Sequence, residues 1–279
     1  MRFIGNISFI PFSLKIFLTR KDRRLRFLLP QGKEFVFDKY LGDLKVNINT
    51  IYPIEVEMLT GVYDPNTSAI IRRFVRQNSV VVDVGANVGA LTLLMAKIAN
   101  AGKVIAIEPG PPTCLRLKDN LKLNPELQKV VNVFQVGVSN KVGECFWKED
   151  QKNRGNAGLL GSDGYTVGVE TLNNIVKSTG IEKLDFIKID VEGMEYEVIK
   201  GGMASIVKYR PLIYYETLEP FRNYRGFDLY GKIHDLLQGI GYQHFCVLPN
   251  GEIVKVDNLD VLHSSDALAI PKEKVDMFA

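Results

Sequence analysis

The chain has 279 residues, of which 46% are hydrophobic and 24% are charged, so it is long enough to bury one sizeable core. Its formal net charge of +3 is too small to indicate a nucleic-acid partner without a clustered basic face. Three cysteines and three histidines match neither a disulfide framework nor the spacing of a metal site, which favours a reduced, cytoplasmic setting.

The first 57 residues differ from the rest and are expected to form an extension to a main domain that spans residues 58–279. Basic and apolar side chains are interleaved in this extension, as in segments that lie on an anionic membrane surface. Its apolar part is interrupted by Pro11 and Lys15 and is shorter than the roughly 20 residues that a spanning helix needs. No small-residue cleavage site follows, which argues against a secretory signal. The reading that we favour is a cap on the core or on a partner subunit, with peripheral membrane contact as the alternative.

Residues 80–90 predict a buried strand, a tight turn and the start of a helix over residues 91–99. A continuous β-branched run is typical of a central parallel strand that is buried on both faces. The turn has the pattern D-x-G-x-N-x-G, formed by Asp83, Gly85, Asn87 and Gly89. This spacing differs from the G-x-G-x-x-G of dinucleotide-binding turns. Because a carboxylate here would repel a pyrophosphate and attract an ammonium group, the turn favours S-adenosylmethionine over NAD.

A second strand, expected over residues 103–107, ends in Glu108, whose carboxylate can accept hydrogen bonds from both hydroxyls of a ribose. NAD enzymes share an acid at this place, so Glu108 alone does not discriminate between the two cofactors. Prolines then open a helix expected over residues 113–123, since a proline at a helix start loses no hydrogen bond. Residues 130–138 are expected to form one third strand that ends at the same carboxyl edge of the sheet. Ligands bind at this edge in open α/β sheets.

The glycine-rich segment 148–164 is expected to be a surface loop over the site. Acidic residues follow the fourth and fifth expected strands. Asp190 and Glu192 end the fourth strand and would point to the same side if the backbone stayed extended. Glu216 ends the fifth strand, residues 211–215. The alternation of strands and helices predicts a doubly wound α/β fold with a mostly parallel sheet.

The segment after the fourth strand predicts a helix over residues 194–200 with Gly201 and Gly202 as its C-terminal cap. A purely structural alternative exists for the two acids before it. One of them would cap this helix, and the other would pair with Lys188 or Arg210.

Four blocks of sequence, in this order, resemble the FkbM-type S-adenosylmethionine-dependent methyltransferases. They are the Asp83–Gly89 turn, Ile107-Glu108-Pro109, Glu170-Thr171-Leu172-Asn173-Asn174 and the segment Asp185–Glu195. The resemblance covers roughly residues 58–220 and implies the class I methyltransferase (Rossmann-like) fold. In that fold a seven-stranded sheet carries an antiparallel last strand, expected here at residues 267–271. The resemblance also implies O-methylation of a hydroxyl on a sugar, a glycan or another small molecule.

The resemblance further implies a set of cofactor-binding residues. They are Asp83, Gly85, Asn87 and Gly89 at the methionine end, Glu108 at the ribose, Val138 and Ser139 near the adenine, and Tyr63 in the segment before the first strand. Asp64 and Asn173 depart from the family, which more often has a glutamate and an aspartate at these places. Thr171 is still expected to cap the helix that follows it.

Methyl transfer to a hydroxyl requires alignment of the acceptor oxygen, exclusion of water and removal of one proton. The candidates for catalysis are Asp190 and Glu192, with Glu216 as an acid on the substrate side. His234 and His244 are weaker candidates. Asp190 and Glu216 could alternatively hold Mg²⁺, which prefers oxygen ligands, although we expect no metal.

Three functions remain to be compared. The leading one is an O-methyltransferase with a small-molecule or glycan acceptor. A second is a catalytically inactive, cofactor-binding scaffold that takes part in glycan assembly at a membrane, although the intact carboxylates argue against it. A third, an NAD-dependent oxidoreductase, is disfavoured by the glycine spacing.

Overall fold

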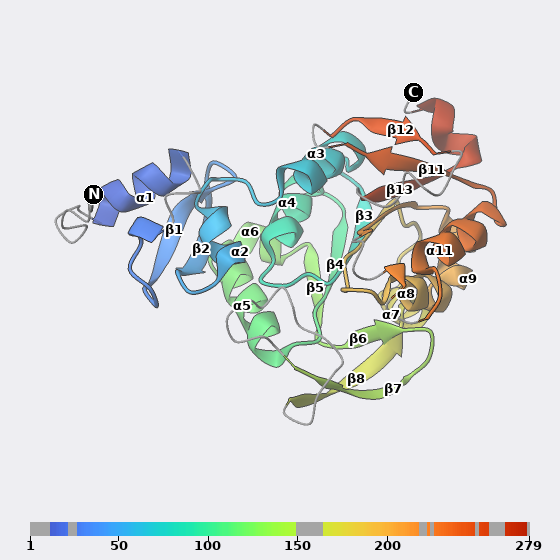
Figure 1. Cartoon of the computed structure of the whole chain (residues 1–279), viewed down its shortest axis with the longest axis horizontal. Helices are drawn as coiled ribbons and strands as arrows, with labels where there is room; N and C mark the ends of the chain where they lie inside the picture. The colour runs from blue at the N-terminus through green and yellow to red at the C-terminus, as the bar shows by residue number, and fades with distance from the viewer. Residues whose placement is uncertain are drawn as a thin grey trace.

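The fold is built on one long β-sheet that runs through the centre of the molecule (Figure 1). The computed structural model describes residues 12–21, 27–148, 164–217, 222–223, 226–248, 251–256 and 266–277. Within these residues the central sheet has eight strands, in the order β12-β11-β13-β10-β9-β3-β4-β5. They are β3 (Val80–Val84), β4 (Lys103–Ile107), β5 (Val131–Phe134), β9 (Phe186–Ile189), β10 (Leu212–Tyr215), β11 (Tyr242–Val247), β12 (Ile253–Lys255) and β13 (Ala267–Pro271).

Helices cover both faces of this sheet and enclose a hydrophobic core on each. The first face is covered by α3 (Pro65–Phe74), α4 (Ala90–Ile98), α5 (Pro111–Lys122) and α6 (Pro125–Gln128). The second is covered by α7 (Leu172–Ser178), α8 (Glu195–Gly201), α9 (Met203–Tyr209) and α11 (Leu229–Gln238). Strand β3 serves both cores, because Val81 packs on the first face and Val82 on the second. Its unbroken apolar sequence reflects this two-sided burial.

The described sheet confirms the doubly wound α/β architecture. Strands β5, β4, β3, β9 and β10 are parallel, and β13 pairs antiparallel with both β10 and β11. The last strand therefore has the direction and the bounds that the sequence predicted. The sheet differs from the expected seven strands because β12 adds an edge strand, paired antiparallel with β11. The 3-10 helix η5 (Lys272–Met277) ends the described chain.

Two local expectations were wrong. Residues 130–138 do not form one strand, because the chain leaves the central sheet after Phe134 and forms β6 (Gly137–Ser139). Strand β6 pairs parallel with β8 (Tyr165–Thr171), which also pairs with β7 (Gly143–Trp147). Figure 1 shows this small sheet below the helices of the second face.

The second error concerns Gly201, the last residue of α8, and Gly202, which follows it. Gly202 has φ −100°, a right-handed conformation, and α9 begins directly after it, so the pair does not form a left-handed helix cap. Close packing requires these glycines instead. A Cβ on Gly201 would lie 2.2 Å from the carbonyl oxygen of Ser139, and one on Gly202 would lie 2.7 Å from Leu172.

The N-terminal part begins with α1 (Phe12–Lys21), on which Leu14 and Phe17 are 44% and 51% exposed. A hairpin of β1 (Glu34–Tyr40) and β2 (Leu44–Asn49) follows, and then α2 (Pro53–Met58). In the described part of the chain, no helix is both long and apolar enough to cross a membrane.

Side-chain amides of α5 and of the turn after it join the hairpin to the main domain. Asn120 accepts a hydrogen bond from the backbone N–H of Asn47 at 2.8 Å and donates one to the carbonyl of Val88 at 2.8 Å. Asn124 accepts from the backbone N–H of Lys45 at 3.0 Å and donates to its carbonyl at 2.7 Å. These amides pair the outer edge of β2 as a neighbouring strand would, which satisfies backbone groups that burial would otherwise leave unpaired.

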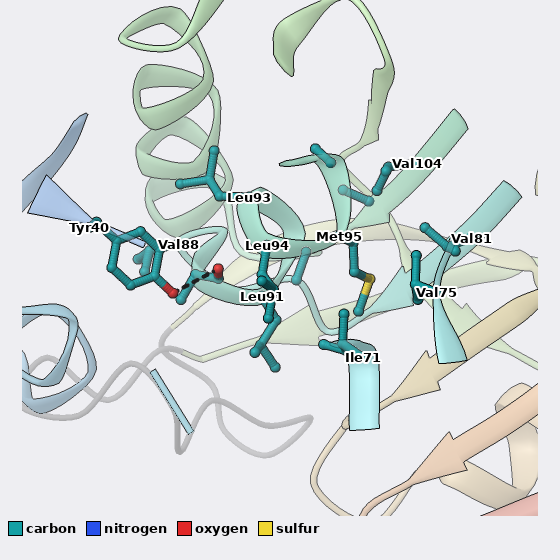
Figure 2. Packing of buried hydrophobic residues seen from close by; sticks show 14 of the residues in the cluster. Tyr40, Ile71, Val75, Val81, Val88, Leu91, Leu93, Leu94, Met95 and Val104 are labelled. Carbon is teal, nitrogen blue, oxygen red and sulfur yellow. Dashed lines mark hydrogen bonds between the residues drawn. The ribbon is translucent and has the colours of Figure 1, made fainter. Parts of the chain in front are cut away.

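Tyr40 ties the same hairpin to α4. Its ring is fully buried in the core of the first face, beside Val88 and Leu91 (Figure 2). Its hydroxyl donates a hydrogen bond of 2.9 Å to the carbonyl of Ala90, the first residue of α4. Helix α4 begins directly after the Asp83–Gly89 turn, so this contact links the N-terminal part to the position of that turn.

We predict that Tyr40→Phe lowers the free energy of unfolding by about 1 kcal/mol, because it removes one buried hydrogen bond and keeps the ring. Chemical denaturation of the variant checks this value. Tyr165→Phe is the matched control, since Tyr165 is 46% exposed and should change stability little. Equal stability of Tyr40→Phe and the wild type would show that the contact does not hold the hairpin.

Candidate active site

The candidate site lies at the carboxyl ends of β3, β4, β9 and β10, which are neighbours in the central sheet. Each of these strands is followed directly by residues that the sequence singled out. In parallel strands these ends share one edge, which is where open α/β sheets bind ligands. The geometry of the turns at this edge therefore decides what the site can hold.

Two glycines shape the turn after β3. Gly85 has φ +76°, and a Cβ on it would lie 1.8 Å from the carbonyl oxygen of Asp190. The turns after β3 and β9 thus touch through their backbones at a place where only glycine fits. Gly89 has φ +89° and faces Leu117 of α5, which a Cβ would approach to 2.4 Å. Both glycines therefore allow neighbouring segments to pack closely against the turn after β3.

A buried lysine joins the same two turns. The Nζ of Lys188, on β9, lies 3.2 Å from a carboxylate oxygen of Asp83 and 3.3 Å from one of Asp190. It also donates a hydrogen bond of 2.9 Å to the carbonyl of Gly85. The lysine is 3% exposed and Asp83 is fully buried. Although burial alone would lower the pKa of Lys188, the two carboxylates raise it above its usual value.

Asp83 therefore faces the interior of the protein. Its second oxygen accepts a hydrogen bond of 2.6 Å from the hydroxyl of Thr92 on α4. Its described partners are thus Thr92 and Lys188. The aspartate fixes α4 and β9 relative to β3, and it contributes negative charge beneath the turn.

The carboxylate of Glu108 is held by two backbone N–H groups. One of its oxygens accepts the backbone N–H of Asn87 at 2.9 Å, and the other accepts that of Gly110 at 2.9 Å. These bonds hold the carboxylate at the end of β4 and connect it to the cofactor turn. These two hydrogen bonds use two of the roughly four acceptor positions of a carboxylate.

Three carboxylates meet on the side of β9 and β10. Asp190, Glu192 and Glu216 each place an oxygen within 4.8 Å of the other two. Burial, together with the charge of Asp190, raises the pKa of Glu192 to about 7 and that of Glu216 to about 10. One oxygen of Glu216 is buried and has no hydrogen-bond partner among the described residues. The cluster thus has spare capacity for a cation or a hydroxyl.

Glu192 reaches this cluster by a different route from the one that the sequence predicted. Strand β9 ends at Ile189, and Glu192 has φ +53°, so the backbone is not extended through it. A left-handed turn at Glu192 and Gly193 brings the side chain beside Asp190. The structural alternative, in which one acid caps α8 and the other pairs with Lys188 or Arg210, is seen only in part. Asp190 pairs with Lys188. Helix α8 has no side-chain cap, and Arg210 pairs with Glu273 instead.

Sequence reasoning missed Asp266, which precedes β13 at the same edge. Its carboxylate hydrogen-bonds to the hydroxyl of Tyr214, which in turn lies 2.7 Å from the hydroxyl of Thr67. Burial raises the pKa of Asp266 to about 6, and the charge of Asp190 contributes in the same direction. No motif surrounds Asp266. Only the antiparallel placement of β13 beside β10 could have located it.

The remaining residues that the sequence assigned to the cofactor lie outside the central sheet: Tyr63 shortly before α3, and Val138 and Ser139 on β6 of the small sheet. Burial raises the pKa of Tyr63, and the charges of Asp190 and Asp64 raise it further. Asp64 caps α3 by accepting the backbone N–H of Thr67 at 3.2 Å. Val138 and Ser139 lie half-buried on β6, next to α8.

One prediction about the third block can be compared with the structure. The cap by Thr171 is confirmed, because its hydroxyl accepts the backbone N–H of Asn174 at 3.2 Å. Asn173 binds the backbone N–H of Ser205 at 2.9 Å, which joins α7 to α9.

Most of the segment 148–164, the expected loop over the site, falls outside the described residues.

The histidines form a separate buried pair. The rings of His234 and His244 lie 4.5 Å apart, and Tyr215 packs against His244. Burial, with a smaller contribution from His234, lowers the pKa of His244 to about 3, so this ring is neutral at physiological pH. Cys114 and Cys246 are buried and Cys145 is half-buried, and none of the three forms a disulfide in the structure.

The chemistry of the edge fits a cofactor that carries a sulfonium, an ammonium group and a ribose. Carboxylates outnumber their described cationic partner, Lys188, and the unpaired oxygen of Glu216 can face a positive charge. Oxygens of Asp190, Glu192 and Glu216 could also surround a divalent cation.

Comparison with known proteins decides the class. Residues 83–244 match the family model of the methyltransferase FkbM domain. The chain belongs to the FkbM methyltransferase family. This confirms the resemblance that its sequence motifs indicated, and it identifies the protein as a methyltransferase whose cofactor is S-adenosylmethionine.

Several named methyltransferases are similar to the chain. Methyltransferase sdnD of Sordaria araneosa is 29% identical over 51% of this chain and 68% of its own length. The hexuronic acid methyltransferase AglP of Haloferax volcanii is 29% identical over 45% of this chain and 50% of its own length. The 2-O-methyltransferase NoeI of Sinorhizobium fredii is 24% identical over 55% of this chain and 72% of its own length. The solved structure of methyltransferase FkbM from Methylobacillus flagellatus KT is 14% identical, covers 92% of this chain and 58% of that one, and has a TM-score of 0.47.

We predict that Lys188→Met lowers the free energy of unfolding by about 3–5 kcal/mol, because it leaves Asp83 buried without its cation. The double variant Asp83→Asn with Lys188→Met should regain part of this loss. Lys183→Met is the control, because its ion pair with Asp185 is exposed and contributes little. Denaturation of the four proteins checks the prediction, and a Lys188→Met variant as stable as Lys183→Met would contradict it.

Proposed function

We propose that the protein transfers a methyl group from S-adenosylmethionine to a hydroxyl of a sugar, a glycan or another small molecule. The observation that carries this proposal is the meeting of Asp190, Glu192 and Glu216 beside the cofactor turn. A hydroxyl acceptor needs a group that takes its proton, and these carboxylates lie where the strands of this fold bind ligands. The names of AglP and NoeI, which methylate a hexuronic acid and a 2-O position, support an oxygen acceptor.

The cofactor would lie across the ends of β3 and β4. Glu108 would accept hydrogen bonds from the ribose hydroxyls while it keeps its bonds to Asn87 and Gly110. The turn formed by Gly85, Asn87 and Gly89 would hold the methionine end, and Tyr63 would close that side. Asp83 is fully buried, so it would act on the cofactor only through its negative charge. Val138 and Ser139 would border the adenine.

The bound cofactor supplies a methyl group that is already activated by the positive sulfur. The protein must hold the acceptor oxygen in line with that methyl group and remove its proton. Glu192 is our candidate for the general base, because a pKa of about 7 suits proton removal at neutral pH. Asp190 is held by Lys188 and would orient the acceptor, while the protonated Glu216 would donate a hydrogen bond to it.

Two alternatives have distinct tests. The same carboxylates could hold Mg²⁺, and loss of activity on dialysis against a chelator would favour that reading. An inactive scaffold at a membrane would bind the cofactor without turnover. The exposed Leu14 and Phe17 on α1 are compatible with peripheral membrane contact, which flotation of liposomes with the full chain would test.

We predict that Glu108→Ala weakens the binding of S-adenosylmethionine at least about tenfold, because charge-assisted hydrogen bonds to the ribose contribute roughly 1.5–3 kcal/mol. Isothermal titration calorimetry measures this affinity. Glu126→Ala is the control, since Glu126 is exposed on α6 and lies outside the proposed site. Equal affinities of Glu108→Ala and the wild type would remove Glu108 from the cofactor site.

We predict that kcat/KM rises as the pH rises through about 7, because Glu192 accepts a proton only after it has lost its own. Glu192→Gln should abolish this rise and lower kcat about 100-fold, the usual contribution of a general base. The exposed Glu182→Gln is the control. A Glu192→Gln variant that keeps the wild-type pH profile would assign the proton transfer to another group.

A further inference from the structure

The turn that carries Glu192 has an unusual backbone. Glu192 has φ +53° and Gly193 has φ +94°, so two consecutive residues adopt the left-handed region. For a residue with a side chain this conformation is unfavourable and persists only where neighbouring contacts impose it. Glu192 is nevertheless the residue whose carboxylate must reach Asp190 and Glu216. Some group must therefore hold this turn.

Glu195 makes the contacts that can impose this conformation. One carboxylate oxygen of Glu195 accepts the backbone N–H of Val191 and that of Gly193, each at 3.2 Å. These two amides lie on either side of Glu192, so the contacts span the strained residue. Glu195 is 1% exposed, and water therefore cannot easily replace it.

The position of Glu195 in the chain explains how it reaches back. It is the first residue of α8, and Met194 before it provides no side-chain cap. An acid in the first turn also faces the positive end of the helix dipole. Glu197 shares that first turn, but the amides of Val191 and Gly193 are bonded to Glu195. Helix stabilisation and turn fixation can thus be separated by mutation.

We propose that Glu195 is a positioning residue that sets the left-handed turn at Glu192 and thereby holds the carboxylate of Glu192 within reach of Asp190 and Glu216. This inference rests on the proposed function, because it assumes that Glu192 acts in methyl transfer. Glu195 touches backbone amides of the turn and acts on the reaction only through them.

Two substitutions separate positioning from charge. Glu195→Gln keeps the length of the side chain and an oxygen that accepts both amides, but it removes the charge. Glu195→Asp keeps the charge but is one methylene shorter, so its oxygen is withdrawn from the turn. Positioning predicts that Glu195→Gln stays close to wild-type turnover, whereas Glu195→Asp loses about 100-fold in kcat, as a misplaced catalytic group does.

Three further readouts complete the experiment. Glu195→Asp should keep its affinity for S-adenosylmethionine, measured by calorimetry, while hydrogen exchange at the amides of Val191 and Gly193 accelerates. In Glu195→Gln both amides should remain protected. Glu197→Gln is the matched control for a lost acid in the first turn of α8, and it should retain turnover and the protection of both amides.

The reverse order, with Glu195→Asp active and Glu195→Gln inactive, would overturn the proposal, because it would show that the charge matters. Rapid exchange of both amides in the wild type would also overturn it, whether or not the variants fold. If Glu195→Asp exchanges both amides rapidly and still turns over normally, the turn does not position a catalytic group. Failure of the proposed function would look different, since wild-type protein would then bind the cofactor without methylating any hydroxyl acceptor.

Discussion

The structure depends on one buried interaction, the contact of the Lys188 ammonium group with Asp83 and Asp190. Asp83 lies within β3 and is fully buried, so it would be costly to bury without a cation, whereas Asp190 follows β9 and is 38% exposed. The lysine lies between them and also binds the carbonyl of Gly85, so the turns after β3 and β9 are fixed by one side chain. Because Gly85 lacks a Cβ, the two turns can approach to backbone contact. Charge pairing and steric fit therefore both fix the turns after β3 and β9 relative to each other.

This arrangement leaves the edge acidic. Lys188 lies below the turns, whereas Glu192, Glu216 and Asp266 lie at or near the edge with pKa values raised by burial. At neutral pH Glu216 keeps its proton and Glu192 keeps its proton in part of the molecules, unless a cation approaches. A cofactor with a positive sulfur would provide that charge, and the proposed hydroxyl acceptor would provide a proton for the proposed base. The chemistry of the FkbM family and the electrostatics of this edge are therefore consistent with one another.

Much of this could be predicted from the sequence. Continuous apolar strands that end in Asp83, Glu108, Asp190 and Glu216 indicate carboxylates at one edge, because parallel strands align their ends. The backbone of the turns could not be predicted. An extended chain through Glu192 was a reasonable expectation from alternation, yet the chain makes a left-handed turn there, and Glu195 bonds to the backbone amides on either side of it. Asp266 was missed because β13 is brought beside β10 only by the folded sheet. The break between β5 and β6 likewise depends on pairing with β8.

The central claim is that a positive cofactor binds against carboxyls that hold protons in the free protein. Calorimetry of S-adenosylmethionine binding at pH 7, in buffers of different ionisation enthalpy, measures how many protons are released on binding. The account predicts net proton release, because a cation lowers the pKa of Glu192 from about 7. S-adenosylhomocysteine, which lacks the positive sulfur, should release fewer. Binding of both compounds with no proton release, or with equal release, would contradict the account.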